Sequence, residues 1–283
     1  MTKLKGIIRN LDETTYHAHS ALSSTNARLI LDSPARFHYR QSHPQEAKEV
    51  FDVGTAAHSK VLGVGSGVVA YPVEHLTPSG NVSTKAATVE WAAVQRAGGL
   101  VPVSPNDIEA VNLMAESVLA HSESRRILET AALREVSLFA TDPATNVEVR
   151  ARFDIYGDNE CADLKTALNA SPHGFMKAVW NHRYDVQQEH YLKVRELITG
   201  DRPKFTYLAV EKTAPYLVGV YRLDDQWQEI GDVWATAARK LLRACTDANL
   251  WPGYGSEVHN LTPPMGLIYD HQERFETHGE MVI

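Results

Sequence analysis

Apolar and polar residues alternate most clearly over residues 148–166, where the chain reads EVRARFDIYGDNECADLKT. Two short alternating runs flank a Gly-Asp-Asn turn signal, a pattern typical of a β-hairpin. Residues two apart on a strand share a face, so Asp163 and Lys165 are expected to point the same way while Leu164 points into the core. Pairing of the two strands can bring Asp154, late in the first run, beside them.

The remaining pattern predicts alternating strands and helices. Further strands are expected over 133–140, 205–212 and 216–222, beside those at 146–157 and 160–166. Helices are expected from Ser23 or Ser24 to Ile30, from Ser33-Pro34 onward, and over 47–62, 84–97, 104–121, 172–182, 185–199 and 224–249. The predicted fold class is α/β, with a mixed central sheet flanked by helices and a helical N-terminal lobe.

We expect one domain over residues 1–283, with no repeat or obvious linker. It would consist of a mainly helical lobe over 1–125, an α/β core over 130–250 and a C-terminal extension over 251–283. The chain is 43% hydrophobic and 22% charged, which is typical of a globular chain that buries a substantial core.

Composition also narrows the setting of the protein. No run of eighteen apolar residues exists, and the N-terminus lacks the apolar centre of a signal peptide, so we expect a cytoplasmic protein without a membrane partner. Cys161 and Cys245 are the only cysteines. They are too few for a disulfide framework or for the four thiolates of an iron–sulfur cluster, so no such cluster is expected.

The formal net charge of -7 is unevenly distributed. Residues 224–283 hold ten Asp or Glu and four Lys or Arg, a balance of -6, whereas the first fifty residues hold seven basic residues against five acidic ones. Phosphate binding requires a local basic surface rather than a basic protein. The counts therefore permit a DNA enzyme, and they equally fit an ordinary acidic protein.

Two carboxylates and one ammonium on neighbouring strands are chemically suited to a divalent cation. Asp154 and Asp163 would repel each other, and a cation such as Mg²⁺ would remove that penalty. Lys165 could orient or deprotonate an attacking water and offset charge on a phosphate. This is the chemistry of metal-assisted phosphodiester hydrolysis, although an isolated D-x-K triplet is more often a solvated strand face.

Other motifs accompany this triplet in a fixed order. They are GTAAH at residues 54–58, the aspartate and DLKT of the hairpin, and QEHY at 188–191 preceded by Gln187. This order resembles the PD-(D/E)XK nuclease superfamily, in its RecB-like and RecE-like branch. The segments at 22–37, 210–216 and 251–254 resemble the RecE (exonuclease VIII) type of phage and prophage exonuclease, so the likeness covers about residues 22–264. The proline that names the superfamily is replaced here by Phe153.

The resemblance implies roles for particular residues. Metal ligands would be His58, Asp154, Asp163, the backbone carbonyl of Leu164 and, on the preceding strand, Glu135. Catalytic residues would be Asp154, Asp163, Lys165, Gln187 and Tyr191. Candidate DNA-binding residues near the N-terminal helices are Arg28, Arg36 and Arg40. Taken singly, each residue also has an ordinary structural explanation. His58 could be a core histidine, and Gln187 and Tyr191 could be a helix pair that packs on the sheet. Glu135 could be a solvated strand residue, and each of the arginines could be a plain surface residue.

The resemblance implies a Mg²⁺-dependent 5′-to-3′ exodeoxyribonuclease, with Mn²⁺ as an alternative metal. Such an enzyme digests one strand of linear double-stranded DNA from its end and leaves a 3′ tail for a phage-type single-strand annealing protein. Its relatives form homo-oligomeric rings, so a tetramer is expected. Two alternatives stay open: a structure-specific or restriction-like endonuclease on the same fold, and a non-catalytic DNA-binding protein that kept the fold. A zinc hydrolase is less well supported, because no HExxH pair appears.

Overall fold

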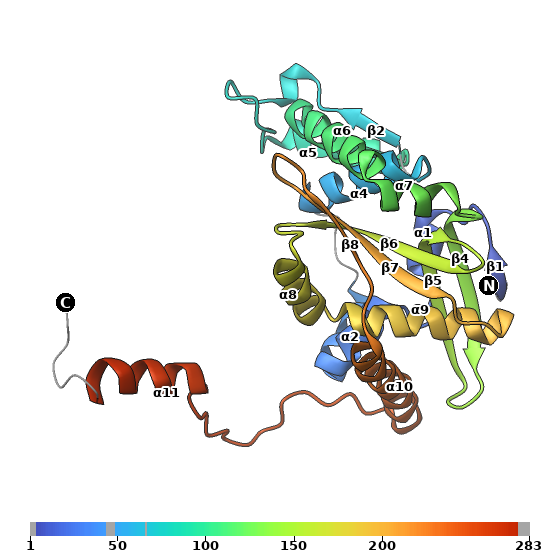
Figure 1. Cartoon of the computed structure of the whole chain (residues 1–283), viewed down its shortest axis with the longest axis vertical. Coiled ribbons are helices and arrows are strands. Elements are labelled where there is room, and N and C mark those ends of the chain that lie inside the picture. The colour runs from blue at the N-terminus through green and yellow to red at the C-terminus, as the bar shows by residue number, and fades with distance from the viewer. Residues whose placement is uncertain (1–3, 44–48, 66, 277–283) are drawn as a thin grey trace. The chain divides into compact units, whose positions relative to one another are not determined.

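A computed structural model of the chain describes residues 4–43, 49–65 and 67–276. The described chain divides into two compact units, residues 1–251 and 252–283. Figure 1 shows the first unit as a sheet with helices on both faces. This arrangement confirms the predicted α/β class with a mixed, helix-flanked sheet.

The main sheet has six strands in the order β1-β4-β5-β6-β7-β8. Their bounds are β1 Gly6–Ile8, β4 Leu133–Asp142, β5 Val147–Tyr156, β6 Glu160–Ala167, β7 Lys204–Glu211 and β8 Val218–Tyr221. Strands β6 and β7 run parallel, and the other neighbours are antiparallel. A parallel pair requires a long crossover, which helices α8 (Pro172–His182) and α9 (Tyr184–Thr199) provide.

One face of the sheet packs against helices α9, α2 (Ser24–Asp32), α3 (Pro34–Ser42) and α10 (Asp225–Ala248). The crossing of α9 and α10 is close, because a Cβ on Gly231 would lie 2.5 Å from the carbonyl oxygen of Asp185. Only glycine permits that approach without displacing the backbone. The N-terminal arm, with β1 and α1 (Glu13–Ala18), adds a strand beside β4.

The other face packs against α4 (Glu49–Leu62), α6 (Pro105–Ala120) and α7 (Ser122–Glu129). Beyond them lie helix α5 (Ala86–Ala97) and a small parallel sheet of β2 (Gly67–Ala70) and β3 (Leu100–Val103). The predicted helix over 47–62 is present, although residues 47 and 48 lie outside the described residues. The pattern missed β1, α1, β3 and α7, which are all short.

The second unit contains α11 (Met265–His271), which continues as a π-helical turn over Gln272–Glu276. Within the described residues of both units, no helix combines the length and the apolar character that crossing a lipid bilayer requires.

Candidate metal and catalytic site

Helices α2 and α3, which carry the three candidate DNA-binding arginines, each begin at a serine cap. The side chain of Ser23 accepts a hydrogen bond from Asn26 N, and that of Ser33 accepts one from Arg36 N, so each serine caps a helix. These helices begin where the sequence predicted. Helix α9 begins at Tyr184, one residue before the predicted start, after Arg183 in a left-handed conformation.

The alternation of buried side chains is interrupted near the middle of the sheet. Phe153 and Tyr156 both pack in the same apolar cluster, although strict alternation would place residues three apart on opposite faces. Asp154 lies inside this interruption. Its side chain is 12% exposed.

Glu135 lies at the corresponding position of strand β4. The strand pairs on either side of it place it directly opposite Asp154. Its φ angle is 49°, in the left-handed region that non-glycine residues seldom adopt. Like charges directly opposite each other destabilise a sheet, and strained residues cluster at functional sites. The two features together make Glu135 a candidate site residue.

Asp163 is at the same level on the third strand. The ladder between β5 and β6 consists of two pairs, Ile155 with Ala162 and Tyr156 with Cys161, and it ends there. Instead of a further ladder bond, Leu164 N donates to Asp154 Oδ2 at 2.8 Å. Continuing the register places Asp163 beside Asp154. Carboxylates thus occupy one level of three adjacent strands, at positions 135, 154 and 163.

His58 reaches this level from helix α4. Its Nδ1 lies 3.4 Å from Asp154 Oδ2, so the predicted approach of the imidazole to the aspartate is present. Burial, assisted by the charge of Lys165, lowers the pKa of His58 to about 4 against the opposing effects of Asp163 and a hydrogen bond to the Leu164 backbone. The ring is therefore neutral near pH 7, which is the form that binds a metal.

His58, Glu135 and Asp154 could hold a divalent cation, because ligand atoms of the three lie within 4.8 Å of one another. Burial raises the pKa of Asp154 well above its usual value, and Asp163 and Glu135 raise it further. Burial also raises the pKa of Glu135. A divalent cation would relieve this repulsion, and the donor set of carboxylate oxygens and one imidazole suits Mg²⁺ or Mn²⁺.

Asp163 makes a different set of contacts. Its Oδ2 lies 2.6 Å from Lys165 Nζ, and its Oδ1 accepts from Gln187 Nε2 at 2.7 Å. Lys165 Nζ also donates to Gln187 Oε1 at 3.1 Å. Asp163, Lys165 and Gln187 thus form a closed ring of polar contacts, while Leu164 is fully buried on the other side, as the alternation predicted.

Tyr184 lies against Lys165 in the candidate site, a position that the sequence did not predict. Lys165 Nζ lies 4.6 Å from the centre of its ring, within cation–π range. Its position three residues before Gln187 on the same helix was the available signal. Burial of Lys165 favours its neutral form, but the negative charge of Asp163, followed by Tyr184 and Asp154, outweighs this and raises the pKa of the lysine.

Tyr191 lies one turn beyond Gln187 and faces the apolar core. Its ring packs 5.1 Å from that of Phe153 and 6.3 Å from that of Phe205. Its side chain hydrogen-bonds with that of Ser24. The structure therefore gives Tyr191 a packing position behind the site, and a catalytic role for it stays a prediction.

The three candidate DNA-binding arginines have separate surroundings. Arg28 joins α2 to the end of α8, donating to the carbonyl oxygen of His182 at 2.6 Å. Arg36 pairs with Asp32 on the surface at 2.7 Å. Arg40 is half-buried in the last turn of α3. Their contact with DNA stays a prediction.

Comparison with known proteins supports the fold. Residues 23–262 match the family model described as a PDDEXK-like domain of unknown function (DUF3799). The crystal structure of a candidate exonuclease from Eubacterium rectale superposes with a TM-score of 0.59 at 10% identity, covering 91% of this chain and 96% of that one. LHK-Exo in complex with dAMP aligns at a TM-score of 0.26 and 14% identity, over 71% of this chain and 98% of its own. No curated protein sequence matches the chain.

Proposed function

The chain belongs to the PDDEXK-like DUF3799 family, and from that premise we propose that it is a metal-dependent nuclease that digests linear DNA from an end. The observation that carries the proposal is the level of three carboxylates on adjacent strands, with His58 on one side and Lys165 on the other. More specifically, we propose the RecE type of activity, which removes one strand in the 5′-to-3′ direction and leaves a 3′ tail.

His58, Glu135 and Asp154 would hold the first cation, with the Leu164 carbonyl and Asp163 as further ligands. A bound divalent cation would stabilise negative charge on a phosphate oxygen and lower the pKa of a coordinated water. Glu135 and Asp154 are deprotonated when they bind it, and His58 is already neutral. The protein thus supplies a nearly preformed ligand set whose unfavourable charge the cation offsets.

Lys165 would act through its charge rather than as a base. Its raised pKa keeps the ammonium protonated at neutral pH. It can therefore donate to a non-bridging phosphate oxygen or orient the attacking water, but it is poorly suited to removing a proton. Gln187 fixes the lysine by accepting from Nζ while donating to Asp163. We expect Lys165→Ala to lower the cleavage rate by about 100- to 1000-fold.

The test uses linear duplex DNA labelled at either the 5′ or the 3′ end, beside a covalently closed circular duplex. With Mg²⁺, the linear duplex should shorten from its 5′ ends and the circle should stay intact, and EDTA should stop all cleavage. Asp163→Ala should remove metal-dependent cleavage. Asp158→Ala is the matched control, because Asp158 lies exposed in the turn of the same hairpin.

Other outcomes assign the alternatives. Cleavage of the closed circle would indicate an endonuclease on this fold. Full nuclease activity in Asp163→Ala, after removal of host nucleases, would contradict the assignment. If the wild-type protein binds DNA but neither cleaves it nor binds Mg²⁺ in calorimetry, it is a non-catalytic DNA-binding protein.

We further propose a homo-oligomeric ring, a tetramer by preference, that acts with a phage-type single-strand annealing protein. The RecE-type motifs in the sequence support this assembly. Analytical ultracentrifugation of the purified chain measures the ring size directly, and a monomer at micromolar concentration would exclude the ring.

A further inference from the structure

Beyond the metal and its ligands, helix α8 presents an unusual exposed face. His173, Met176, Lys177 and Trp180 recur at the spacing of one helix face, and all four are exposed. Trp180 is 69% exposed and Met176 48%. The opposite side of the helix buries Phe175 and Val179 in the core. Large exposed apolar residues gathered on one face mark a binding surface.

The loop before α8 adds another exposed apolar residue close to the site. Leu168, three residues after Lys165, is 88% exposed. The loop around it is held firmly: Lys212 N donates to the carbonyl of Ala167 at 3.0 Å, and Ala170 N donates to Glu211 Oε1 at 2.9 Å. Leu168 is therefore held out into water by an anchored backbone. Anchoring an apolar side chain in solvent is unfavourable unless a ligand covers it.

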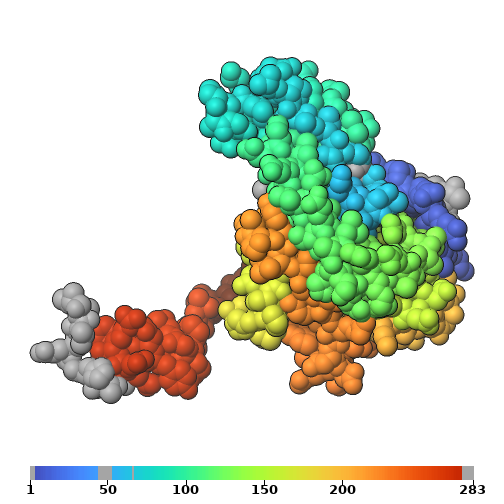
Figure 2. All heavy atoms as spheres, turned by 45° about the horizontal axis from the view of Figure 1, so that its top comes forward, coloured from blue at the N-terminus to red at the C-terminus, as the bar shows by residue number. Residues whose placement is uncertain are grey.

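The segment that contains α8 and the loop before it is basic, whereas the whole chain has a net charge of -7. Residues 164–184 contain no Asp or Glu but include Lys165, Lys177 and Arg183, with His173 and His182 besides. Lys165 pairs with Asp163 and Arg183 with Asp185, so Lys177 on α8 is the lysine of this segment that faces solvent. The segment includes the proposed catalytic lysine near its start and continues into the exposed face of α8. Figure 2 shows α8 (yellow) on the exterior, close to the β7–β8 hairpin (orange). A polyanion that leaves the site across α8 would meet Lys177 and no carboxylate carried by that helix.

We propose that α8 and the loop before it bind an unpaired DNA strand next to the site, with bases stacked on Trp180 and Met176 and phosphates bound by Lys177. Duplex DNA hides its base faces, so an aromatic and apolar platform favours a single strand. The cations suit the backbone, and the exposed aromatic ring suits any base. This inference rests on the proposed nuclease function, because it gives the platform its position beside the cleaved phosphate.

The test measures the binding of a fluorescein-labelled single-stranded oligonucleotide by anisotropy, in EDTA and with the full chain. Trp180→Ala should raise the dissociation constant about tenfold, and Trp180→Phe should keep most of the affinity. Lys177→Ala should lower the slope of log affinity against log salt by about one unit. Leu119→Ala on α6 and Lys204→Ala at the start of β7 are matched controls for an exposed apolar residue and an exposed lysine, and neither should change binding.

A second measurement separates this proposal from the nuclease assignment. Hydrolysis of the small substrate bis(p-nitrophenyl) phosphate depends on the metal site but has no strand to stack. Trp180→Ala should leave it unchanged. If the wild-type protein fails to hydrolyse this substrate and DNA, the nuclease function fails, while the binding assay in EDTA still decides the platform.

An unchanged dissociation constant in Trp180→Ala would overturn the platform. If, in addition, that variant changes the sedimentation of the protein, the exposed face is instead an interface between copies of the chain. If Trp180→Ala weakens single-strand and closed-circular duplex binding equally, the surface does not select unpaired bases, and the proposal is likewise wrong.

Discussion

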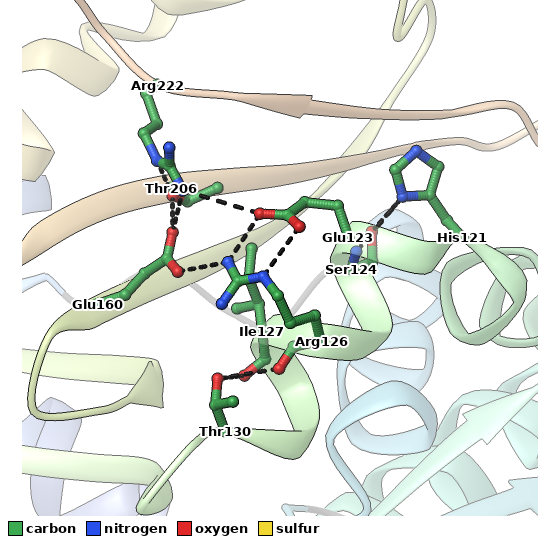
Figure 3. A network of polar contacts seen from close by, with 9 residues as sticks. All are labelled: His121, Glu123, Ser124, Arg126, Ile127, Thr130, Glu160, Thr206 and Arg222. Atoms are coloured by element: carbon green, nitrogen blue, oxygen red, sulfur yellow. Dashed lines mark hydrogen bonds and ion pairs between the residues drawn. The ribbon is translucent and has the colours of Figure 1, made fainter.

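Strand β6 lies beside two groups of carboxylates that differ in their surroundings, one at its start and one around its middle. At its start, Glu160 accepts hydrogen bonds from Arg126, Arg222 and Thr206, each at 2.6 Å (Figure 3). Burial alone would raise the pKa of Glu160, but these donors lower it to about 2. Glu123 also pairs with Arg126 and closes the network. This end of the strand is a fully compensated structural clamp between β6, β7, β8 and α7.

Around Asp163, in the middle of β6, the carboxylates have fewer cationic partners. Asp154 has Leu164 N and the neutral His58 ring beside it, and its pKa is raised. Lys165 is the cation that pairs with Asp163. Arg152 lowers the pKa of Glu135 by less than burial raises it, whereas two arginines donate directly to Glu160 at the clamp. The difference teaches that one sheet can satisfy a carboxylate for stability and leave others with raised pKa values where a metal could bind.

The largest expected effect comes from removing the negative charge of Asp154 at the candidate metal site. Asp154→Asn should reduce Mg²⁺-dependent cleavage by at least about 1000-fold, because a ligand is lost. In EDTA the variant should be no less stable than the wild type, since it removes like-charge repulsion. Mg²⁺ at about one hundred times its dissociation constant should stabilise the wild type by about 2.7 kcal/mol and the variant much less. Thermal unfolding with Mg²⁺ and with EDTA measures both effects.

A loss of stability in EDTA would contradict this reading of Asp154. It would mean that the hydrogen bond from Leu164 N, rather than charge repulsion, dominates the energy of the carboxylate. Asp158→Asn serves as the control, because that side chain lies in the exposed turn of the same hairpin.

A substitution in the Glu160 clamp should have the opposite effect: it should lower stability and leave cleavage nearly unchanged. Glu160→Gln removes the carboxylate that Arg126 and Arg222 share and leaves Glu123 as their acidic partner. It should lower the free energy of unfolding by about 1–2 kcal/mol, a range reduced for the solvent that reaches Arg126 and Arg222. Cleavage by the folded variant should stay within about twofold of wild type. Urea denaturation measures the stability, with the exposed Glu129→Gln as control. A loss of activity without a loss of stability would show that the Glu160 clamp and the candidate metal site are coupled.

The smallest expected effect is on the pH dependence of stability, to which Glu160 and Asp154 contribute with opposite signs. The lowered pKa of Glu160 means that its contribution to stability is present above pH 4.5 and is lost as pH falls toward 2. The raised pKa of Asp154 has the opposite sign: without metal, stability falls as pH rises above 3.8 and the carboxylate ionises.

Mg²⁺ affinity should therefore weaken as the pH is lowered from 8, because the raised pKa of Asp154 lets the carboxyl hold its proton at a higher pH than an ordinary aspartate. His58, with its pKa of about 4, is already neutral at pH 6 and above and should not contribute there. Calorimetry in two buffers of different ionisation enthalpy counts the released protons. Asp154→Asn should reduce the proton release per bound Mg²⁺ to the share of Glu135, and a His58-dependent release near pH 6 would contradict the assignment.

Much of the fold could be predicted because its signals are local. Ser33 and Ser104 cap helices through hydrogen bonds to residues three positions away, and the turn between β5 and β6 follows from its Gly-Asp-Asn sequence. The sharing of a face by Asp163 and Lys165 follows from the period of a strand. The short elements β3 and α7 were missed because four to eight residues carry little periodicity.

The sequence by itself determined the order of strands and helices and the presence of acids, a lysine and a histidine at spacings that resemble a nuclease. The tertiary structure alone decided that Glu135 stands opposite Asp154 in a strained backbone, that Tyr184 lies against Lys165, and that Trp180 remains in solvent. Periodicity and capping act over a few residues, whereas strand register and burial depend on parts of the chain that are far apart in sequence.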